Sequence, residues 1–496
     1  ILTHYLSASY NNLSVQDVTI QHVWYRGIVV RAMSGGTSSG HQVINVTVDD
    51  LAGCTLAGES RGQAFGILYF DAAGEIGHTT ISNVGSGIAA SSYTVTPTQV
   101  NIHHNAVSLV DVQAYTLVYN AAGSLLESNS ADFDSGGASG IALLVDQPQG
   151  LSVRHNTFTG AKIGIFMGRQ AGPAENLLIG EGNLINGAGS GVYLTHGILA
   201  DGSSLAVNIN TNFIVQGTTI SNYSTGISLD RADSTGVNNV VVRGNNLLNN
   251  GLGLFKGVRS NLTMDHNRIL GNSYAGVESI TTSLVAENNW WGCNEGPGTT
   301  DCDEVSGLVD ATPWLVLTSG AADASVPPGS TLTLQPKLIL NSAGLDTSAV
   351  GAVADGILAT FSAPEGGTVL PEEAESLDGS FGDVVFTPPL SPGIYRACVD
   401  LDHEQICNSL NIPNVAPQAV ADSYAGTEDI PLEVSAPGVL ANDSDANQTT
   451  LSAILLTDAT YGDLTLNADG SFTYLPEHNW GGEDTFTCKV SDGSLA

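Results

Sequence analysis

Basic side chains are scarce in this sequence of 496 residues. Lys and Arg together number 14, against 49 Asp and Glu, which gives a formal net charge of −35. Nucleic acids and anionic membrane surfaces are bound through clusters of Lys and Arg, so we expect neither as a partner. No apolar run approaches the roughly 18 residues of a membrane-spanning helix, and no signal peptide is visible. We therefore expect no transmembrane segment in this stretch of chain.

Aromatic residues are also few, at 6% of the chain, whereas Gly alone accounts for 58 residues. Gly, Asn, Ser, Thr and Val favour turns and strands over helices, and an apolar fraction of 42% is enough to fill packed cores. The length predicts roughly three domains. The first residue is Ile1, inside a strand-like pattern, so we expect a fragment of a longer precursor.

The first three-fifths of the chain repeat a short phrase of Gly followed by apolar residues, mostly at intervals of about 21 to 28 residues. The phrase begins or centres at Gly27, Gly66, Gly87, Gly140, Gly164, Gly191, Gly226, Gly251 and Gly276. A second phrase, with alternating apolar residues and an Asn, lies between the copies. We expect each repeat to be a coil of three short strands that buries its inner face only by stacking on its neighbours, with Val240, Val242, Leu262 and Met264 pointing inward.

The Asn of the second phrase recurs from coil to coil. Its copies are Asn105, Asn156, Asn183, Asn246, Asn267 and Asn289. Asn tolerates left-handed turn geometry, and stacked Asn side chains hydrogen-bond to one another. The pattern therefore predicts an asparagine ladder along the stacked coils.

On these repeats, together with the ending NNWWGCNEGPG…CDEV…PWL, residues 1–315 resemble right-handed parallel β-helix proteins of the pectate-lyase-like type. The ending resembles the terminal coil of secreted bacterial members of that group. We expect Trp290, Trp291 and the loop between Cys293 and Cys302 to cover the open end of the β-helix. A covered end blocks edge-to-edge pairing. We also expect this segment to form the joint to the next domain.

Strands at about ten-residue spacing follow from Val316 and suggest β-sandwiches. Residues 316–413, with the phrases DGILATFSAPEGG and GDVVFTPPLSPGIYRACVDLD, resemble a bacterial Ig-like domain of the invasin/intimin type. Residues 414–496, which begin at a predicted linker and end in VSDGSLA, resemble the cadherin-like tandem repeats of bacterial surface proteins, apparently without their last strand. The predicted fold is thus all-β: a right-handed parallel β-helix followed by two β-sandwiches.

Six cysteines are present. Cys293 and Cys302 bracket one short loop, and Cys398 and Cys407 bracket another, so each pair is close enough for a local disulfide. Zinc is the alternative for these cysteines, although neither pair has a C-x-x-C spacing or a matching His. Two disulfides favour an oxidising, extracellular setting. Cys54 and Cys488 have no obvious partners.

Acidic residues are concentrated after the β-helix. The chain carries 24 acidic and 11 basic residues up to Val316, but 25 and 3 from Leu317 onward. Clustered carboxylate and amide oxygens are the ligands of Ca²⁺, and the cadherin-like resemblance implies Ca²⁺ sites at the turns. The predicted ligands are Glu428, Asp429, Asn442, Asp443, Asp445 and Asp484. Asx residues also form turns without any metal.

Two patterns raise the question of catalysis. His104, His155 and His266 each precede an Asn of the ladder, so a His column is a candidate for metal binding or a general base, although turn residues on the surface are the simpler interpretation. Acidic groups that a polysaccharide-active enzyme would need are sparse: Asp49 with Asp50; Asp230 with Arg231 and Asp233; and Asp132, Asp134 and Asp146. Local signatures of polygalacturonase-like hydrolases and alginate epimerases are absent, so no catalytic residue is assigned.

These observations favour an extracellular structural or adhesive protein of a bacterial cell surface, in which a β-helical rod carries spacer domains. A polysaccharide lyase, hydrolase or epimerase and a non-catalytic carbohydrate-binding protein are the alternatives. Unpaired strand edges at the chain ends suit assembly with neighbouring copies into a filament or surface layer, and truncation of a longer chain is the simpler explanation of the same edges. Glycans or other cell-surface components are further expected partners.

Overall fold

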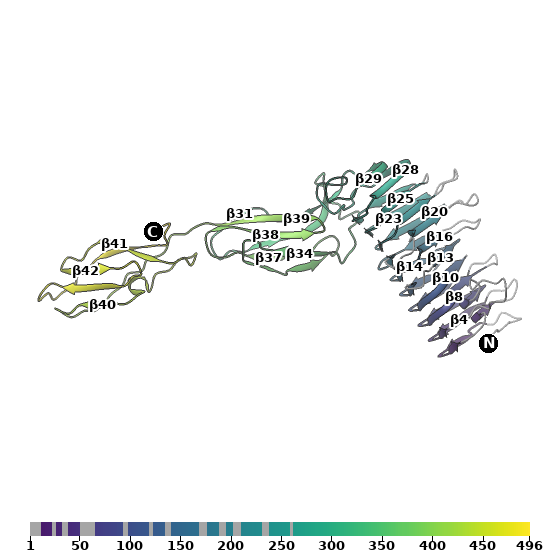
Figure 1. Ribbon diagram of the computed structural model, residues 1–496, viewed down its shortest axis with the longest axis horizontal. Helices are drawn as coiled ribbons and strands as arrows, with labels where there is room; N and C mark the ends of the chain where they lie inside the picture. Colours follow the sequence, from purple (N-terminus) through teal and green to yellow (C-terminus); the bar gives the residue numbers. More distant parts are fainter. Residues whose placement is uncertain are drawn as a thin grey trace.

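The computed structural model describes residues 11–21, 26–31, 38–49, 65–92, 98–118, 123–133, 140–167, 176–187, 195–201, 210–230, 238–257 and 261–496. Three parts follow one another along the chain (Figure 1). A stack of short parallel strands comes first, and two smaller β-sheet units extend from its C-terminal end as an arm. Among the described residues, no helix has the length and apolar character needed to cross a membrane.

The stacked part is a parallel β-helix with three sheets, each built from one strand per coil. The first sheet contains β1 (Ser14–Gln16), β4 (Ser38–Ile44), β7 (Ala72–Gly77), β9 (Val100–His103), β11 (Leu125–Glu127), β14 (Ser152–Arg154), β17 (Leu177–Ile179), β20 (Asn210–Gln216), β23 (Asn238–Arg243) and β26 (Leu262–Asp265). All of these pairings are parallel, so the stacked-coil fold predicted from the repeats is confirmed.

The second sheet follows one turn later in each coil. It contains β2 (Thr19–Gln21), β5 (Thr47–Asp49), the first halves of β8 (Thr80–Ser91) and β10 (Ala106–Val118), β12 (Ser130–Asp132), β15 (Thr157–Thr159), β18 (Leu184–Asn186), β21 (Thr219–Ser221), β24 (Asn246–Leu248) and β27 (Arg268–Leu270). Inside the stack, strands of three residues are long enough because each one pairs with a strand on both sides.

The third sheet completes the coil. It contains β3 (Arg26–Arg31), β6 (Phe65–Phe70), the second halves of β8 and β10, β13 (Ile141–Asp146), β16 (Ile163–Met167), β19 (His196–Asp201), β22 (Thr225–Asp230), β25 (Leu252–Lys256), β28 (Ala275–Val285) and β29 (Val305–Asp310). The alternating residues Val240, Val242, Leu262 and Met264 are all buried in the common core, as predicted.

One column of turns joins the first sheet to the second, and every member has a positive φ. The column consists of Asp17, Asn45, His78, His104, Ser128, His155, Gly182, Gly217, Gly244, His266 and Asn288. Left-handed geometry favours Gly and Asx residues, which explains much of this composition. The eleven coils that the described residues form, at the spacing of paired strands, make a rod about 50 Å long.

Most of these turns are followed by an Asn, and these Asn residues form the asparagine ladder. Asn105, Asn129 and Asn156 each donate from the side-chain amide to the side-chain oxygen of the next Asn, at 2.8, 3.0 and 3.0 Å. Asn245 and Asn267 continue the ladder towards Asn289, both at 2.9 Å. The ladder predicted from the sequence is therefore present, but its members differ at two places.

The prediction of Asn246 as a ladder residue is wrong by one position. Asn245 is fully buried in the ladder, whereas Asn246 is half-buried and donates only to Thr219 in the second sheet. Asn129 was not predicted, and Thr218 takes the place of Asn between Asn183 and Asn245. Asn245 and Asn246 are adjacent and both suit a turn, so the sequence does not show which of them belongs to the ladder.

Glycines of the predicted phrase form a row across the third sheet, where each lies next to the first paired residue of its strand segment. A Cβ at Gly253 would lie 2.4 Å from the carbonyl oxygen of Gly276, so this position requires a residue without a side chain. Gly27, Gly66, Gly87, Gly164, Gly226 and Gly276 lie in the predicted register. Two others do not, because the pairing places Ala142 and Gly253, and not Gly140 and Gly251, in this row. Gly191 lies outside the described residues.

The second part is a β-sandwich. Its larger sheet has the order β31 (Ala324–Ser325), β39 (Glu404–Ile412), β38 (Gly393–Leu401), β34 (Leu358–Ser362) and β36 (Glu373–Glu375). A smaller sheet contains β32 (Leu332–Leu334), β37 (Val384–Thr387) and β35 (Thr368–Leu370), and β30 (Leu315–Thr318) pairs with β33 (Lys337–Asn341). Apolar residues of both sheets share one core.

The third part has a smaller core in which Val439, Ala453 and Phe472 are buried. One sheet contains β40 (Leu432–Val434), β43 (Phe472–Pro476) and β42 (Gly462–Leu466), and the other pairs β41 (Ser452–Thr457) with β44 (Thr487–Ser491). A short 3-10 turn, η2, covers Gly438–Leu440. The fold is therefore a parallel β-helix followed by two β-sandwich units, as the sequence predicts.

Candidate functional site: a rigid joint

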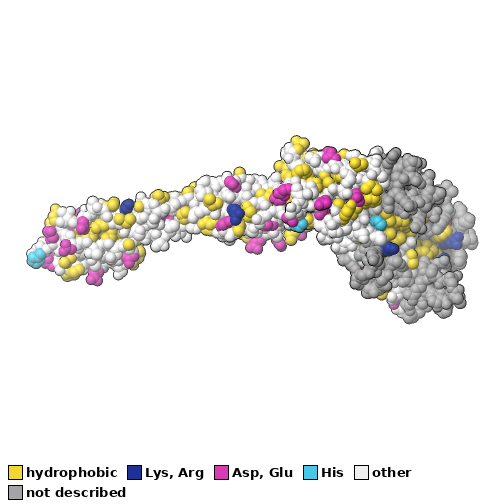
Figure 2. Space-filling model, turned by 45° about the horizontal axis from the view of Figure 1, so that its top comes forward, with side chains coloured by type: hydrophobic (Ala, Val, Ile, Leu, Met, Phe, Trp, Pro, Cys, Tyr) yellow, Lys and Arg dark blue, Asp and Glu magenta, His cyan; other side chains and the backbone are white. Residues whose placement is uncertain are grey.

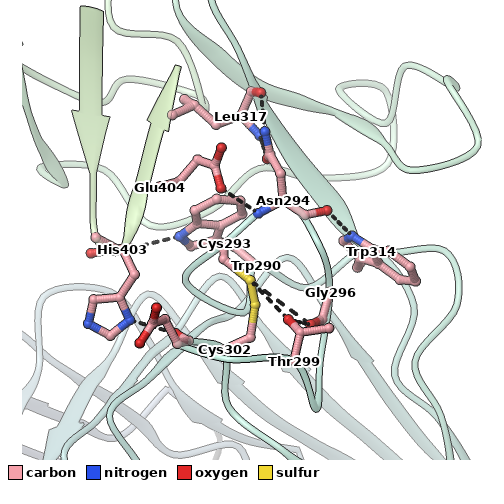
Figure 3. Close-up of a disulfide and its surroundings, with 12 residues drawn as sticks. Trp290, Cys293, Asn294, Gly296, Thr299, Cys302, Trp314, Leu317, His403 and Glu404 are labelled. Carbon is pink, nitrogen blue, oxygen red and sulfur yellow. Dashed lines mark hydrogen bonds between the residues drawn. A yellow bond between two sulfur atoms is a disulfide. The ribbon is translucent and has the colours of Figure 1, made fainter. Parts of the chain in front are cut away.

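The last coil of the β-helix is fastened to the second part through the segment that contains the two tryptophans. Figure 3 shows this joint, with the Cys293–Cys302 disulfide at its centre. Trp290 is fully buried in the core of the second part, whereas its neighbour Trp291 is fully buried in the core of the β-helix. The Trp pair therefore anchors both domains, as expected for the joint that the sequence predicts at this segment.

Asp402 fixes the joint from the other side. It lies at the tip of the hairpin between β38 and β39 with a φ of 57°, and its side chain is only 3% exposed. Its carboxylate accepts a hydrogen bond of 2.6 Å from the indole Nε1 of Trp290. Both Nε and a terminal nitrogen of Arg268, in the last full coil, also donate to this carboxylate. Arg268 and Asp402 thus form a bidentate ion pair that is largely removed from water.

The disulfide loop adds a second set of contacts through Asn294. Its backbone N–H donates to Oε2 of Glu404 at 2.9 Å, and its backbone carbonyl accepts from the indole of Trp314 at 2.8 Å (Figure 3). The side chain of Asn294 bonds to both the N–H and the carbonyl of Leu317. Leu317 lies in β30, a strand of the second part. One asparagine therefore connects three separate segments.

A further contact lies one coil earlier. Asp265 accepts from Arg243 at 2.5 and 2.8 Å, and the ring of His266 lies between Asp265 and Thr347 of the second part, at 2.7 and 3.1 Å. Burial alone would raise the pKa of Asp265, but the hydrogen bonds from His266 and Arg243 lower it below its ordinary value. The carboxylate is therefore ionised at neutral pH and holds both partners by charge.

The joint between the second and third parts is organised by Asn447. This side chain is 2% exposed, and its amide donates to the carbonyls of Leu390 and Pro413 at 2.8 and 3.2 Å. Its oxygen accepts from the backbone N–H of Val415 at 2.8 Å. The segment from Asn414 that was predicted as a linker is therefore held by specific hydrogen bonds.

Both predicted disulfides, Cys293–Cys302 and Cys398–Cys407, are present. The second joins opposite residues of the β38–β39 hairpin, as expected. Among the described residues Cys488 is the free cysteine, and its half-buried position raises the pKa of its thiol. Cys54 lies outside the described residues.

The predicted calcium ligands lie in several loops of the third part, and most already accept hydrogen bonds from the chain. Asp429 accepts from His478 and Asn479, Asp443 from Val420, Asp445 from Asn447 and Thr449, and Asp484 from Thr460, Tyr461 and Tyr474. Asn442 donates to the carbonyl of Ala421. No three carboxylates among the described residues of this part converge within 4.8 Å. Calcium binding by Glu428, Asp429, Asn442, Asp443, Asp445 and Asp484 stays a prediction.

The predicted His column is divided among three environments. His155 is exposed on its turn, and His266 is buried in the joint. His104 lies beside His78 and His103, two residues that the spacing of the ladder phrase did not single out. The signal that was available is the double His before Asn105, with a third His one coil earlier.

Of the acidic residues considered for catalysis, the structure describes the side chains of Asp49, Asp132 and Asp146. Asp49 accepts from Ser82 and Asn83, and Asp132 accepts from Thr159. Asp146 is buried. Asp50, Asp134, Arg231, Asp233 and the side chain of Asp230 lie outside the described residues.

Comparison with solved structures gives matches at low identity. The periplasmic alginate epimerase AlgG is 16% identical, with a TM-score of 0.41, over 62% of this chain and 77% of that chain. The tailspike protein of E. coli bacteriophage HK620 is 13% identical, with a TM-score of 0.42, over 80% of both chains. Invasin, a bacterial integrin-binding protein, is 14% identical, with a TM-score of 0.23, over 37% of both chains.

Among curated protein sequences, none matches this chain. For the third part, one protein family does match. Residues 414–496 match the bacterial cadherin-like domain.

Proposed function

We propose that this chain is a stiff extracellular rod, in which the β-helix and two sandwich domains are held in a fixed arrangement at a bacterial cell surface. The observation that carries the proposal is the Trp290–Asp402–Arg268 contact, which fastens the β-helix to the second domain. A buried bidentate ion pair with an indole donor fixes orientation as well as distance. Domains joined by a loose linker would not need such a contact.

Four further features support an extracellular rod. The two disulfides are typical of oxidising compartments, and residues 414–496 match a bacterial cadherin-like domain. Asn447 holds the second joint. The surface of both sandwich domains carries many acidic and few basic side chains (Figure 2), so mutual repulsion favours an extended arm at low salt.

The test is the distribution of angles between the β-helix and the second domain in electron micrographs of the full chain. We expect one narrow distribution for the wild type and a broad one for Asp402→Ala. Asp400→Ala is the matched control, because Asp400 lies in the same hairpin and its side chain accepts a hydrogen bond from Gln405, a residue of that hairpin. A broad distribution for the wild type would refute the proposal.

Adhesion and assembly into a filament or surface layer are the finer proposals. Sedimentation velocity over a hundredfold range of concentration tests self-association, and a glycan array tests carbohydrate binding. A polysaccharide-active enzyme is the alternative function. Release of unsaturated or reducing sugar ends from alginate or pectate by the purified chain would favour it over a structural role.

Calcium binding by the third domain is a separate proposal. It is supported by the concentration of carboxylates in its loops, where the burial of Asp422 and the nearby charge of Asp443 raise the pKa of Asp422. A bound cation would relieve this repulsion. Calorimetric titration of the wild type and of Asp443→Asn with CaCl₂ tests it, and a wild type that takes up no Ca²⁺ at millimolar concentration would exclude it.

A further inference from the structure

Three histidine rings gather on two neighbouring coils, at the turn between the first and second sheets. His78 follows β7, His103 ends β9, and His104 follows it. The backbone N–H of His78 donates to the carbonyl of His103 at 3.2 Å, so the two coils are in fixed register here. One ring nitrogen from each of the three residues lies within 4.8 Å of the other two.

The nitrogen atoms are spaced as metal ligands are. Nδ1 of His103 lies 3.1 Å from Nδ1 of His104. Two imidazole ligands of a tetrahedral Zn²⁺, each at about 2.05 Å, lie roughly 3.3 Å apart. The ring of His78 stacks on that of His104, with centroids 4.9 Å apart and an interplanar angle of 13°, and a ring nitrogen of His78 lies within 4.8 Å of one on each of the other two rings.

Glu75 sets which nitrogen of His103 is free to bind. Oε1 of Glu75 lies 2.7 Å from Nε2 of His103, and its other oxygen accepts from Gln42 at 3.1 Å. A carboxylate accepts hydrogen bonds and does not donate them. Nε2 therefore carries the hydrogen, and the Nδ1 lone pair faces His104. Carboxylates orient the histidine ligands of many metal sites in this way.

The local backbone leaves room for this arrangement. A Cβ at Gly77 would lie 2.4 Å from Cε1 of His103, so the glycine opens the space in which that ring lies. The turn itself does not require histidine, because Asn45 and Asn288 adopt the same positive φ in other coils. The three rings therefore need another explanation than turn geometry.

We propose that His78, His103 and His104 bind a divalent transition-metal ion of the Zn²⁺ class, with Glu75 as the residue that positions His103. Three imidazoles without a thiolate suit Zn²⁺, Ni²⁺ and Cu²⁺ more than the hard cations Ca²⁺ and Mg²⁺. Three protein ligands leave a fourth position for water or for an oxygen atom of a bound molecule. The site is independent of the joint and of the predicted calcium loops.

The experiment is competition for Zn²⁺ between the full chain and a chromophoric chelator at pH 7.5, followed by the absorption spectrum of the Co²⁺ form. The variants are His78→Asn, His104→Asn and His103→Gln. Each replaces a histidine by a residue that another coil already has at the same place, since Gln216 corresponds to His103 in the sheet register. His155→Asn is the matched control, because His155 has the same turn geometry as His78 and His104 but does not belong to the cluster of three histidines.

We expect one tight site in the wild type, with a tetrahedral Co²⁺ spectrum. His103→Gln and His104→Asn should each weaken Zn²⁺ binding at least about 100-fold, and Glu75→Gln about 10-fold or more, while His155→Asn changes nothing. Melting temperatures measured without metal check that each variant is folded. Wild-type affinity in the His103→Gln/His104→Asn double variant, or no binding by the wild type at micromolar Zn²⁺, would overturn the proposal.

Discussion

Trp290 and Trp291 are neighbours in the sequence, but their indole rings are buried in two different hydrophobic cores. Trp290 packs with residues of the second domain such as Leu315 and Leu317, and Trp291 packs with the core of the β-helix. Adjacent residues of an extended chain point to opposite sides, so a single dipeptide secures both domains. The two positions should therefore differ in what their removal disturbs.

We predict that Trp290→Ala destabilises the second domain and Trp291→Ala the last coils, each by about 3–5 kcal/mol. Hydrogen–deuterium exchange measured by mass spectrometry separates the two outcomes. Exchange should rise in β38 and β39 for Trp290→Ala and in β27 and β28 for Trp291→Ala, while coils before β13 stay protected, because stacked repeats contact only their neighbours. Equal exchange patterns in both variants would contradict the division of the two cores.

The asparagine ladder gives a second prediction, at adjacent positions. Asn245→Ala removes the acceptor of the Thr218 N–H and the donor to Val215 and Asn267, all in a buried row. Unpaired buried groups cost about 1–3 kcal/mol each, so we expect a loss of at least that size in the free energy of unfolding. Asn246→Ala, the matched control, loses only a half-buried bond to Thr219 and should cost under about 1 kcal/mol. Urea unfolding of both variants decides the ladder register.

The predictions from the sequence agree best with the structure at positions where only one or two residue types can satisfy the local contacts. The ladder Asn residues and the Gly row of the third sheet are readable because burial and close backbone contact leave few substitutes. The register fails at Asn245–Asn246 and at Gly251–Gly253, since two copies of the required residue stand close together and only the strand pairing selects one of them. Local composition contains no information on that choice.

Contacts between distant segments were the least predictable part. Asp402, Asn294 and Asn447 hold the joints, yet each is an ordinary turn residue in the sequence. His78 and Glu75 become neighbours of His103 only because one coil stacks on the next, with a period that varies along the chain. The Trp and Cys residues of the joint were recognisable, because such residues are unusual in the repeat.

The buried carboxylate of Asp265 predicts a pH dependence. Its pKa is lowered in the folded state, so its contribution to stability is present above its ordinary pKa of about 4 and is lost as the pH falls through the folded value. We expect Asp265→Asn to cost about 2–3 kcal/mol at pH 7, and the difference from the wild type to shrink as the pH is lowered below about 4.

The control for this prediction is Glu127→Gln, in the same row of the first sheet. Glu127 pairs with Arg154, whose side chain is 48% exposed, and exposed pairs contribute under about 1 kcal/mol. Denaturant unfolding from pH 3 to pH 7 measures both variants. A constant difference between Asp265→Asn and the wild type over this range would show that the charge of Asp265 is not what stabilises the joint.

The last prediction concerns the second joint and separates rigidity from stability. Asn447→Ala removes the hydrogen bonds that connect Leu390, Pro413 and Val415, which belong to the end of one domain and the start of the next. Neither core loses an apolar contact, so we expect each domain to keep its melting temperature while the angle between them broadens. Small-angle X-ray scattering should show that Asn447→Ala is on average less extended than the wild type, because bent forms contribute to the curve. Asn442→Ala, which loses one exposed bond to the carbonyl of Ala421, should leave the scattering curve unchanged. If Asn447→Ala also gives the wild-type curve, the hydrogen bonds of Asn447 are not what aligns the two domains, and packing along the segment must be sufficient.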